Sequence, residues 1–187
     1  MVIKSMHNKI LLHACCAVCV TYPIEFLKKE GFYPIVFFDN SNIYPFEEFE
    51  KRRIELVNYC KKYNIEYIQS RYENEKWTNF VKGLENEPEK GLRCQKCFYY
   101  RLKNTANFAL EGKIKYFTTT LTVSPHKRSK NIFEAGNNVQ KDFNDKIKFL
   151  EFDFKKQNGY LIATKNAKKE GFYRQNYCGC FYSIRKN

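Results

Sequence analysis

Short apolar segments alternate with amphipathic segments along this chain, and this alternation restricts its fold more than any other feature. The predicted strands are apolar runs at residues 10–14, 34–39, 65–69, 115–120 and 148–153. The predicted helices have apolar side chains at helical spacing and cover residues 21–30, 45–63, 77–84, 97–112, 129–143 and 159–170. Strands that alternate with helices form a parallel sheet covered by helices on both faces. The sequence therefore predicts a three-layer, Rossmann-like α/β fold.

The chain length favours one α/β domain over residues 1–187, because domains usually run about 100–200 residues. A charged stretch from Glu73 to Lys90 favours a helical lobe inserted around 73–112. No segment approaches the roughly 20 apolar residues that span a bilayer, and His13 interrupts an N-terminal apolar run too short for a signal peptide. We therefore expect a cytoplasmic monomer with no membrane partner.

Seven of the eight cysteines fall in three tight groups with the spacings CCxxC, CxxC and CxC. Their members are Cys15, Cys16, Cys19, Cys94, Cys97, Cys178 and Cys180. A two-residue spacing lets a loop or a helix start turn two thiolates towards one metal. Clustered thiols in a reducing compartment more often bind metal or do redox chemistry than form structural disulfides. We predict that these seven bind metal, and that Cys60, within a helical segment, is a plain buried residue.

Two kinds of metal site suit these thiols. Four thiolates can hold a structural zinc ion or a [4Fe-4S] cluster. Structural zinc usually stabilises small modules without a core, whereas this chain has apolar strands and helices and more thiols than one zinc ion needs, which favours iron–sulfur chemistry. The pair Cys178 and Cys180 could bind a second metal, or cycle between a dithiol and a strained disulfide.

Several polar residues follow the predicted strands at the edge where parallel sheets bind ligands. The CCxxC group follows the first strand, Asp39 ends the second, and Asp153 ends the fifth. Either aspartate could be an oxygen ligand or an acid, or could only cap a helix or pair with a lysine. His13 directly precedes the thiols, where it could donate a proton or a hydrogen bond, or simply fill the core.

The positive charge of the chain lies in its second half. Lys and Arg outnumber Asp and Glu by 33 to 20, and residues 1–92 carry 13 of each sign, so that residues 93–187 carry 20 basic against 7 acidic side chains. This excess favours a polyanionic partner, nucleic acid before a membrane surface. The candidate RNA-binding residues are Lys127, Arg128, Lys130, Lys168, Lys169 and Arg174.

Four ordered segments together resemble the cobalamin-independent, iron–sulfur epoxyqueuosine reductase family, QueH. They are LLHACCAVC at 11–19, RCQKCFYYRL at 93–102, TTTL at 118–121 with Ser124-Pro125, and YRQNYCGC at 173–180. Four motifs in this order are more specific than any single CxxC pair. The departures leave the thiols intact: Val18 stands where proline is expected, Phe98 where tyrosine is usual, and Asp39 where an aromatic residue commonly ends the strand.

The resemblance implies an oxidoreductase with a nucleotide-hydrolase-like (HUP-like) sheet. Its substrate would be epoxyqueuosine at the wobble position of a tRNA anticodon, reduced to queuosine with electrons from an unidentified donor. By resemblance, Cys15, Cys16, Cys94 and Cys97 would hold a [4Fe-4S] cluster, and an iron bound near a carboxylate could form a second centre. The residues expected to act in catalysis are Cys178, Cys180, His13 and Asp153.

Two other functions remain open from the sequence. A zinc-stabilised RNA-binding module would use the same thiols without catalysis. An ATP-dependent tRNA thiolation enzyme would need a phosphate-binding loop after the first strand. Neither that loop nor a GxGxxG motif is present there, which weighs against ATP or NAD chemistry.

Overall fold

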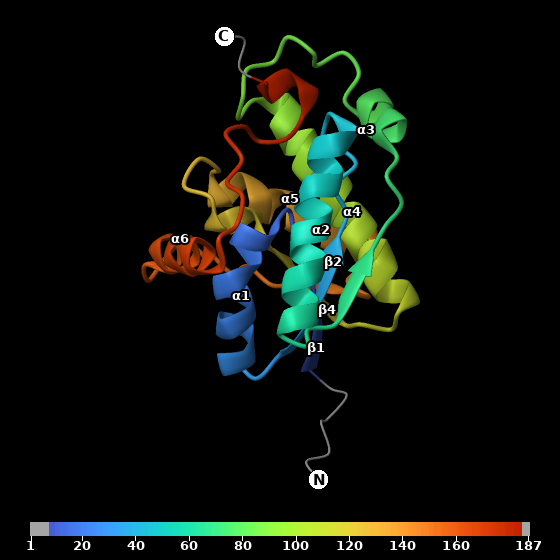
Figure 1. The fold of residues 1–187 in the computed structure, drawn as a ribbon. Coiled ribbons are helices and arrows are strands. Elements are labelled where there is room, and N and C mark those ends of the chain that lie inside the picture. The colour runs from blue at the N-terminus through green and yellow to red at the C-terminus, as the bar shows by residue number, and fades with distance from the viewer. Residues whose placement is uncertain (1–7, 185–187) are drawn as a thin grey trace.

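The computed structural model describes residues 8–184 and contains a five-stranded, all-parallel sheet of order β3-β2-β1-β4-β5 (Figure 1). Its strands are β1 (Lys9–His13), β2 (Tyr33–Phe38), β3 (Tyr67–Gln69), β4 (Tyr116–Thr119) and β5 (Lys148–Phe149). The predicted α/β class and parallel sheet are confirmed. The central strands β1 and β2 are apolar on both faces because helices cover both.

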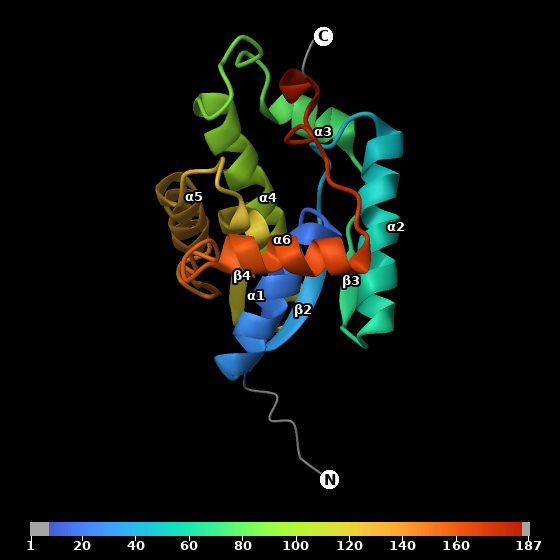
Figure 2. The ribbon, with the colours of Figure 1, turned by 60° about the vertical axis from the view of Figure 1, so that its left-hand side comes forward.

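Helices pack on the two faces of the sheet to give three layers (Figures 1 and 2). The helices are α1 (Ala17–Lys29), α2 (Phe46–Lys62), α3 (Asn74–Phe80), α4 (Leu92–Glu111), α5 (Ser129–Asp142) and α6 (Gly159–Glu170). Ile10 and Leu12 of β1 face the core shared with α1, α2 and α6, whereas Leu11 faces α4 and α5. This alternation along one strand divides the apolar interior into two cores.

Helices α1 and α4 and strand β5 differ from their predicted bounds. Helix α1 begins at Ala17 instead of Thr21, so Cys19 lies in its first turn. Helix α4 begins at Leu92, where the Glu87 carboxylate accepts the Leu92 N–H at 2.8 Å, so Cys94 and Cys97 lie in its first turns. Strand β5 ends at Phe149: the Leu150 N–H still donates to the Phe117 carbonyl of β4, but the Phe152 N–H donates to the Leu150 carbonyl of its own segment. Hydroxyls of β4 and of the 3₁₀ segment that follows it, Thr120–Val123, donate to the carbonyls of Leu150 and Phe152.

Gly136 marks the closest approach of α5 to the sheet. A Cβ at this position would lie 2.3 Å from the ring of Phe149 in β5. We predict that Gly136→Ala lowers the free energy of unfolding by roughly 1–3 kcal/mol, the usual cost of overpacking, despite the better helix propensity of alanine. Urea unfolding of both proteins measures the change. Gly112→Ala is the control, because a Cβ there meets nothing closer than 3.4 Å; equal stabilities of the two variants would contradict the prediction.

Candidate metal centre

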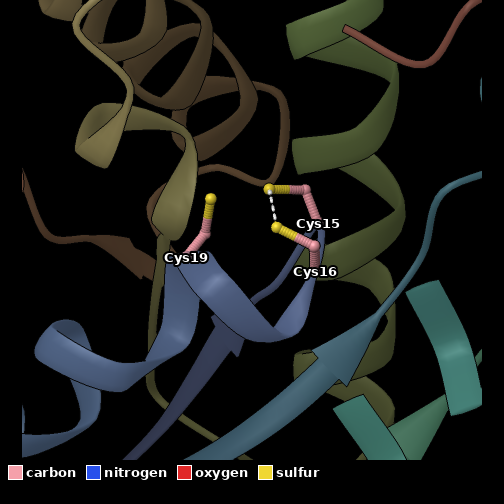
Figure 3. A group of neighbouring side chains, drawn as sticks. All are labelled: Cys15, Cys16 and Cys19. Atoms are coloured by element: carbon pink, nitrogen blue, oxygen red, sulfur yellow. Dashed lines mark hydrogen bonds between the residues drawn. The ribbon is translucent and has the colours of Figure 1, made fainter. Parts of the chain in front are cut away.

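Three thiols converge directly after β1. Cys15, Cys16 and Cys19 place their Sγ atoms within 4.8 Å of one another, and Cys15 Sγ lies 3.8 Å from Cys16 Sγ. Figure 3 shows the three side chains pointing towards one another from the turn and the first turn of α1. Two thiolates on one tetrahedral metal ion, each about 2.3 Å from it, are separated by about 3.8 Å. The triad therefore has the spacing of ligands to a single metal ion.

The local sequence explains why these thiols meet. Cys16 is the extended residue that precedes α1, and Cys19 lies in the first turn of that helix, so residues 16 and 19 share one side. Thr120, which follows β4, brings its hydroxyl to 3.7 Å from Cys15 Sγ. The triad thus stands at the carboxyl end of two neighbouring strands, where parallel sheets bind ligands.

The three thiols of the triad differ in pKa. Contacts with the Cys16 and Cys19 thiols hold the pKa of Cys15 well below its usual range, and the charges of Arg101 and Lys127 add to this while burial opposes it. The same contacts, with Cys15 as acceptor, raise the pKa of Cys16 to about 12 and that of Cys19 well above its usual value. A lowered thiol pKa favours binding of a cation, because cysteine must lose its proton to bind a metal.

The remaining four clustered cysteines line an adjacent cavity. Cys94 and Cys97 face it from α4, and Cys178 and Cys180 face it from the C-terminal segment. Cys97 and Cys180 also pack against Trp77 of α3 in a small apolar cluster. The structure therefore joins the CxxC and CxC motifs, about 80 residues apart in the chain, and keeps CCxxC as a separate neighbouring group.

Burial dominates the chemistry of this second group. It raises the pKa of Cys97 to about 12 and raises the pKa values of Cys94 and Cys180. A backbone N–H, that of Lys90, lies 3.2 Å from Cys94 Sγ. Four thiols around one cavity, one of them accepting a hydrogen bond from a backbone N–H, suit a soft metal or an iron–sulfur cluster better than free thiolates.

A larger cavity of about 410 Å³ opens beside the triad. Its wall includes two thiols of the triad, Cys15 and Cys19, together with Cys178 of the second group. Side chains of α6 and of the segment 174–177 complete it, including Tyr160, Thr164, Arg174, Gln175 and Tyr177. Its volume falls within the range of small-molecule sites, about 300–1,000 Å³. Both thiol groups therefore face a space that can admit a ligand.

Basic side chains surround both groups. Arg101 of α4 and Lys127 line both cavities, and Arg52 of α2 lines the larger one. Burial lowers the pKa of Lys127, but the negative charges of Cys178, Cys15 and Cys19 outweigh it and the net shift is upward. Neither Arg52 nor Arg101 was predicted from the sequence to lie at the site; the only sequence signal is the position of Arg101, one helical turn after Cys97.

His13 is fully buried behind the triad. Its Nδ1 lies 2.8 Å from Thr119 Oγ1 and its Nε2 lies 3.2 Å from the Asp39 carbonyl oxygen, and it lines neither cavity. Burial lowers its pKa to about 3, with Arg101 adding to the shift. The Asp39 side chain accepts hydrogen bonds from Ser70 Oγ at 2.7 Å and Asn104 Nδ2 at 3.0 Å. Both residues connect strands and helices behind the thiols.

The other predicted site residues lie at different distances from the thiols. Asp153 lines neither cavity, and its carboxylate is 3.7 Å from Lys155 Nζ. Arg128 lines the cavity of the second thiol group and Arg174 lines the larger one; both are exposed. Lys130, Lys168 and Lys169 are exposed and line neither cavity. Cys60 is buried and lies in α2, as predicted.

Comparisons with known proteins agree with the arrangement of the motifs. The model of the family described as "Epoxyqueuosine reductase QueH" matches residues 10–186. A relative of that name from Streptococcus pyogenes serotype M1 is 40% identical over 189 residues, covering 97% of this chain and 72% of the relative. Another, from Acinetobacter baylyi, is 37% identical over 178 residues, covering 95% of this chain and 81% of the relative.

A solved structure shares the fold. The U34-tRNA thiolase NcsA from Methanococcus maripaludis with its [4Fe-4S] cluster matches with a TM-score of 0.55 and 13% identity, covering 96% of this chain and 62% of that protein. This likeness shows that the two proteins share an α/β fold. The sequence relatives favour neither a thiolation enzyme nor a binding module. In the described part of the chain, no helix has the length and apolar character to cross a membrane.

Proposed function

Because the chain belongs to the epoxyqueuosine reductase QueH family, we propose that it reduces the epoxide of epoxyqueuosine in a tRNA anticodon, giving queuosine. It is accordingly an oxidoreductase. The observation that supports this function most is the convergence of seven thiols in two groups beside a cavity large enough for a nucleoside. Removal of the epoxide oxygen as water consumes two electrons and two protons, so the site must supply both.

The thiols of the second group fit an iron–sulfur cluster. A [4Fe-4S] cluster takes four cysteine thiolates, each on a different iron, so its ligands surround a space rather than touch one another. Cys94, Cys97, Cys178 and Cys180 are four such thiols around one cavity. We assign the cluster to them, which differs from the set of Cys15, Cys16, Cys94 and Cys97 that the resemblance implied.

The triad fits a second, mononuclear centre. Its sulfur spacing suits one metal ion, which Cys15, Cys16 and Cys19 would hold while it acts on a ligand in the larger cavity that Cys15 and Cys19 line. Together the two groups would supply electrons and a Lewis acid for the epoxide oxygen. We assign iron to the triad, because a redox metal beside a cluster can provide the second electron that the cluster alone does not.

Side chains outside the thiol groups supply a positive charge and hold the thiol-bearing turn in place. Lys127 carries an ammonium group on the wall shared by the two cavities, where it can donate a hydrogen bond to oxygen that becomes negative as the C–O bond breaks. We propose that His13 positions the thiol-bearing turn through Thr119 and Asp39 instead of delivering a proton. We give Asp153 no ligand role, since it lies outside both cavities.

We predict that the basic residues on the cavity walls bind tRNA phosphates more strongly than those at the end of α6. The double variant Arg128→Ala/Arg174→Ala should weaken tRNA binding roughly tenfold at 0.15 M salt and reduce the slope of log affinity against log salt by about 2. Lys168→Ala/Lys169→Ala removes the same charge and is the control, because neither lysine lines a cavity. Filter binding over a range of salt measures both; equal losses would contradict the assignment.

One assay tests the proposed activity. Anaerobically reconstituted protein is incubated with epoxyqueuosine-containing tRNA and dithionite, the tRNA is digested, and its nucleosides are analysed by mass spectrometry. We expect epoxyqueuosine to lose one oxygen atom and become queuosine. Unchanged epoxyqueuosine from protein fully loaded with iron and sulfide would overturn the proposal, as would colourless protein that binds only zinc.

A further inference from the structure

Arg101 is a buried cation that forms no ion pair within residues 8–184, although from beyond ion-pair distance its charge opposes the rise in the pKa of the buried Asp39 carboxyl. Its side chain is 3% exposed and projects from α4, one helical turn after Cys97. One Nη donates to Asn40 Oδ1, and Nε has no hydrogen-bond partner among the described residues. No carboxylate of residues 8–184 lies within ion-pair distance of its guanidinium. A buried charge is costly unless something compensates it.

The two other buried arginines near the thiols make more contacts than Arg101, although each also has one nitrogen without a partner among the described residues, Nη2 of Arg52 and Nε of Arg93. Arg52 pairs with Glu48 at 2.7 Å and donates to the Cys178 carbonyl at 3.2 Å. Arg93 donates to the carbonyls of Leu84 and Glu85, each at 3.0 Å, and to that of Glu87. Their contacts hold loops and a helix in place. The single contact of Arg101, with a neutral amide, satisfies only part of a group that offers five donors.

The position of Arg101 indicates what compensates its charge. Its side chain lines both thiol cavities. Asn40, which donates to the Ala14 carbonyl at 2.8 Å, fixes the guanidinium against the turn that leads to Cys15. Arg101 therefore stands between the two sets of thiols, held there by β1, β2 and α4.

We propose that Arg101 is a positioning residue that provides the counter-charge for the thiolate-bound iron of both groups and raises the reduction potential of the cluster. This inference rests on the proposed cluster assignment. Uptake of one electron by a cluster adds one negative charge without moving a proton, and a nearby fixed cation stabilises that charge. Loss of the cation should therefore disfavour the reduced form.

Potentiometric titration with dithionite, followed by electron paramagnetic resonance of the reconstituted full chain without substrate, tests this role. Arg101→Met should lower the equilibrium constant for one-electron reduction at least tenfold, a potential shift of about −59 mV. Arg101→Lys keeps the charge and should stay closer to the unmodified protein. Lys103→Met is the control, since it removes one charge from an exposed position of the same helix that lines neither cavity.

Each result for the two Arg101 variants either supports or overturns the proposal. Arg101→Met protein that binds its cluster and titrates like the unmodified protein would overturn the proposal. If Arg101→Met fails to bind iron and sulfide while Arg101→Lys binds both, the charge is required for the site and the proposal stands. If neither variant binds the cluster, the guanidinium acts through structure alone and the proposal fails. The potential is measured without tRNA, so this test does not depend on reductase activity.

Discussion

Replacement of Cys97 with serine is expected to abolish epoxide reduction and to remove the acid-labile sulfide from the protein. Cys97 is 8% exposed and lines the cavity of the second thiol group. It also packs against the apolar side chains of Trp77 and Cys180. A serine hydroxyl is a hard, poorly acidic ligand and does not replace a thiolate on iron. We expect turnover to fall by more than about 100-fold, since loss of a group that merely supports a ligand already costs 10–100-fold.

Cys60→Ala is the matched control for this experiment. Cys60 is buried like Cys97, at 1% against 8% exposed. It lies in α2 within the core shared with β1 and α1, and it lines neither cavity. Its replacement should leave iron, sulfide and turnover unchanged. Full sulfide and full turnover in Cys97→Ser would contradict the assignment of the cluster to the second group.

Replacement of Cys19 with serine is expected to remove the mononuclear iron and leave the iron–sulfur cluster in place. Cys19 belongs to the triad and lines the larger cavity but not the cavity of the second group. The variant should keep its sulfide and visible absorbance, lose the iron of the second centre, and lose turnover by at least about 100-fold. Iron and sulfide analysis together with the nucleoside assay measures all three quantities.

Val18→Ser is the control for Cys19→Ser, because it changes the neighbouring residue of the same helix turn on the wall of the same cavity without removing a sulfur. It should retain iron and sulfide. If Cys19→Ser instead loses sulfide in proportion to iron, the cluster is bound by the triad and the division of the thiols is wrong.

The fold was largely predictable because its signals are local. Residues 10–14 and 34–39 are continuous apolar runs, and such runs form central strands of a parallel sheet, as β1 and β2 do. The strand predicted over 148–153 was too long, because its end depends on contacts with other segments of the chain. Leu150 and Phe152 have strand-like composition, but the Phe152 N–H donates to the Leu150 carbonyl, and threonine hydroxyls of the neighbouring segment donate to the carbonyls of both residues.

The sequence predicted which thiols lie near one another in the structure, but not the two groups that they form. The CCxxC and CxxC spacings predict metal ligands, and all seven predicted thiols lie at the same end of the sheet. Which motifs meet depends on how the C-terminal segment folds back over α4, which no local pattern encodes. Buried arginines such as Arg101 also escape prediction, since an arginine in an amphipathic helix is usually exposed.

The most direct test of the two-centre arrangement is diffraction from crystals of the anaerobically reconstituted protein, with anomalous data collected at the iron edge. We predict a cluster bound by Cys94, Cys97, Cys178 and Cys180, and a separate iron bound by Cys15, Cys16 and Cys19. Iron density confined to one group, or a cluster bound by thiols drawn from both groups, would contradict the account.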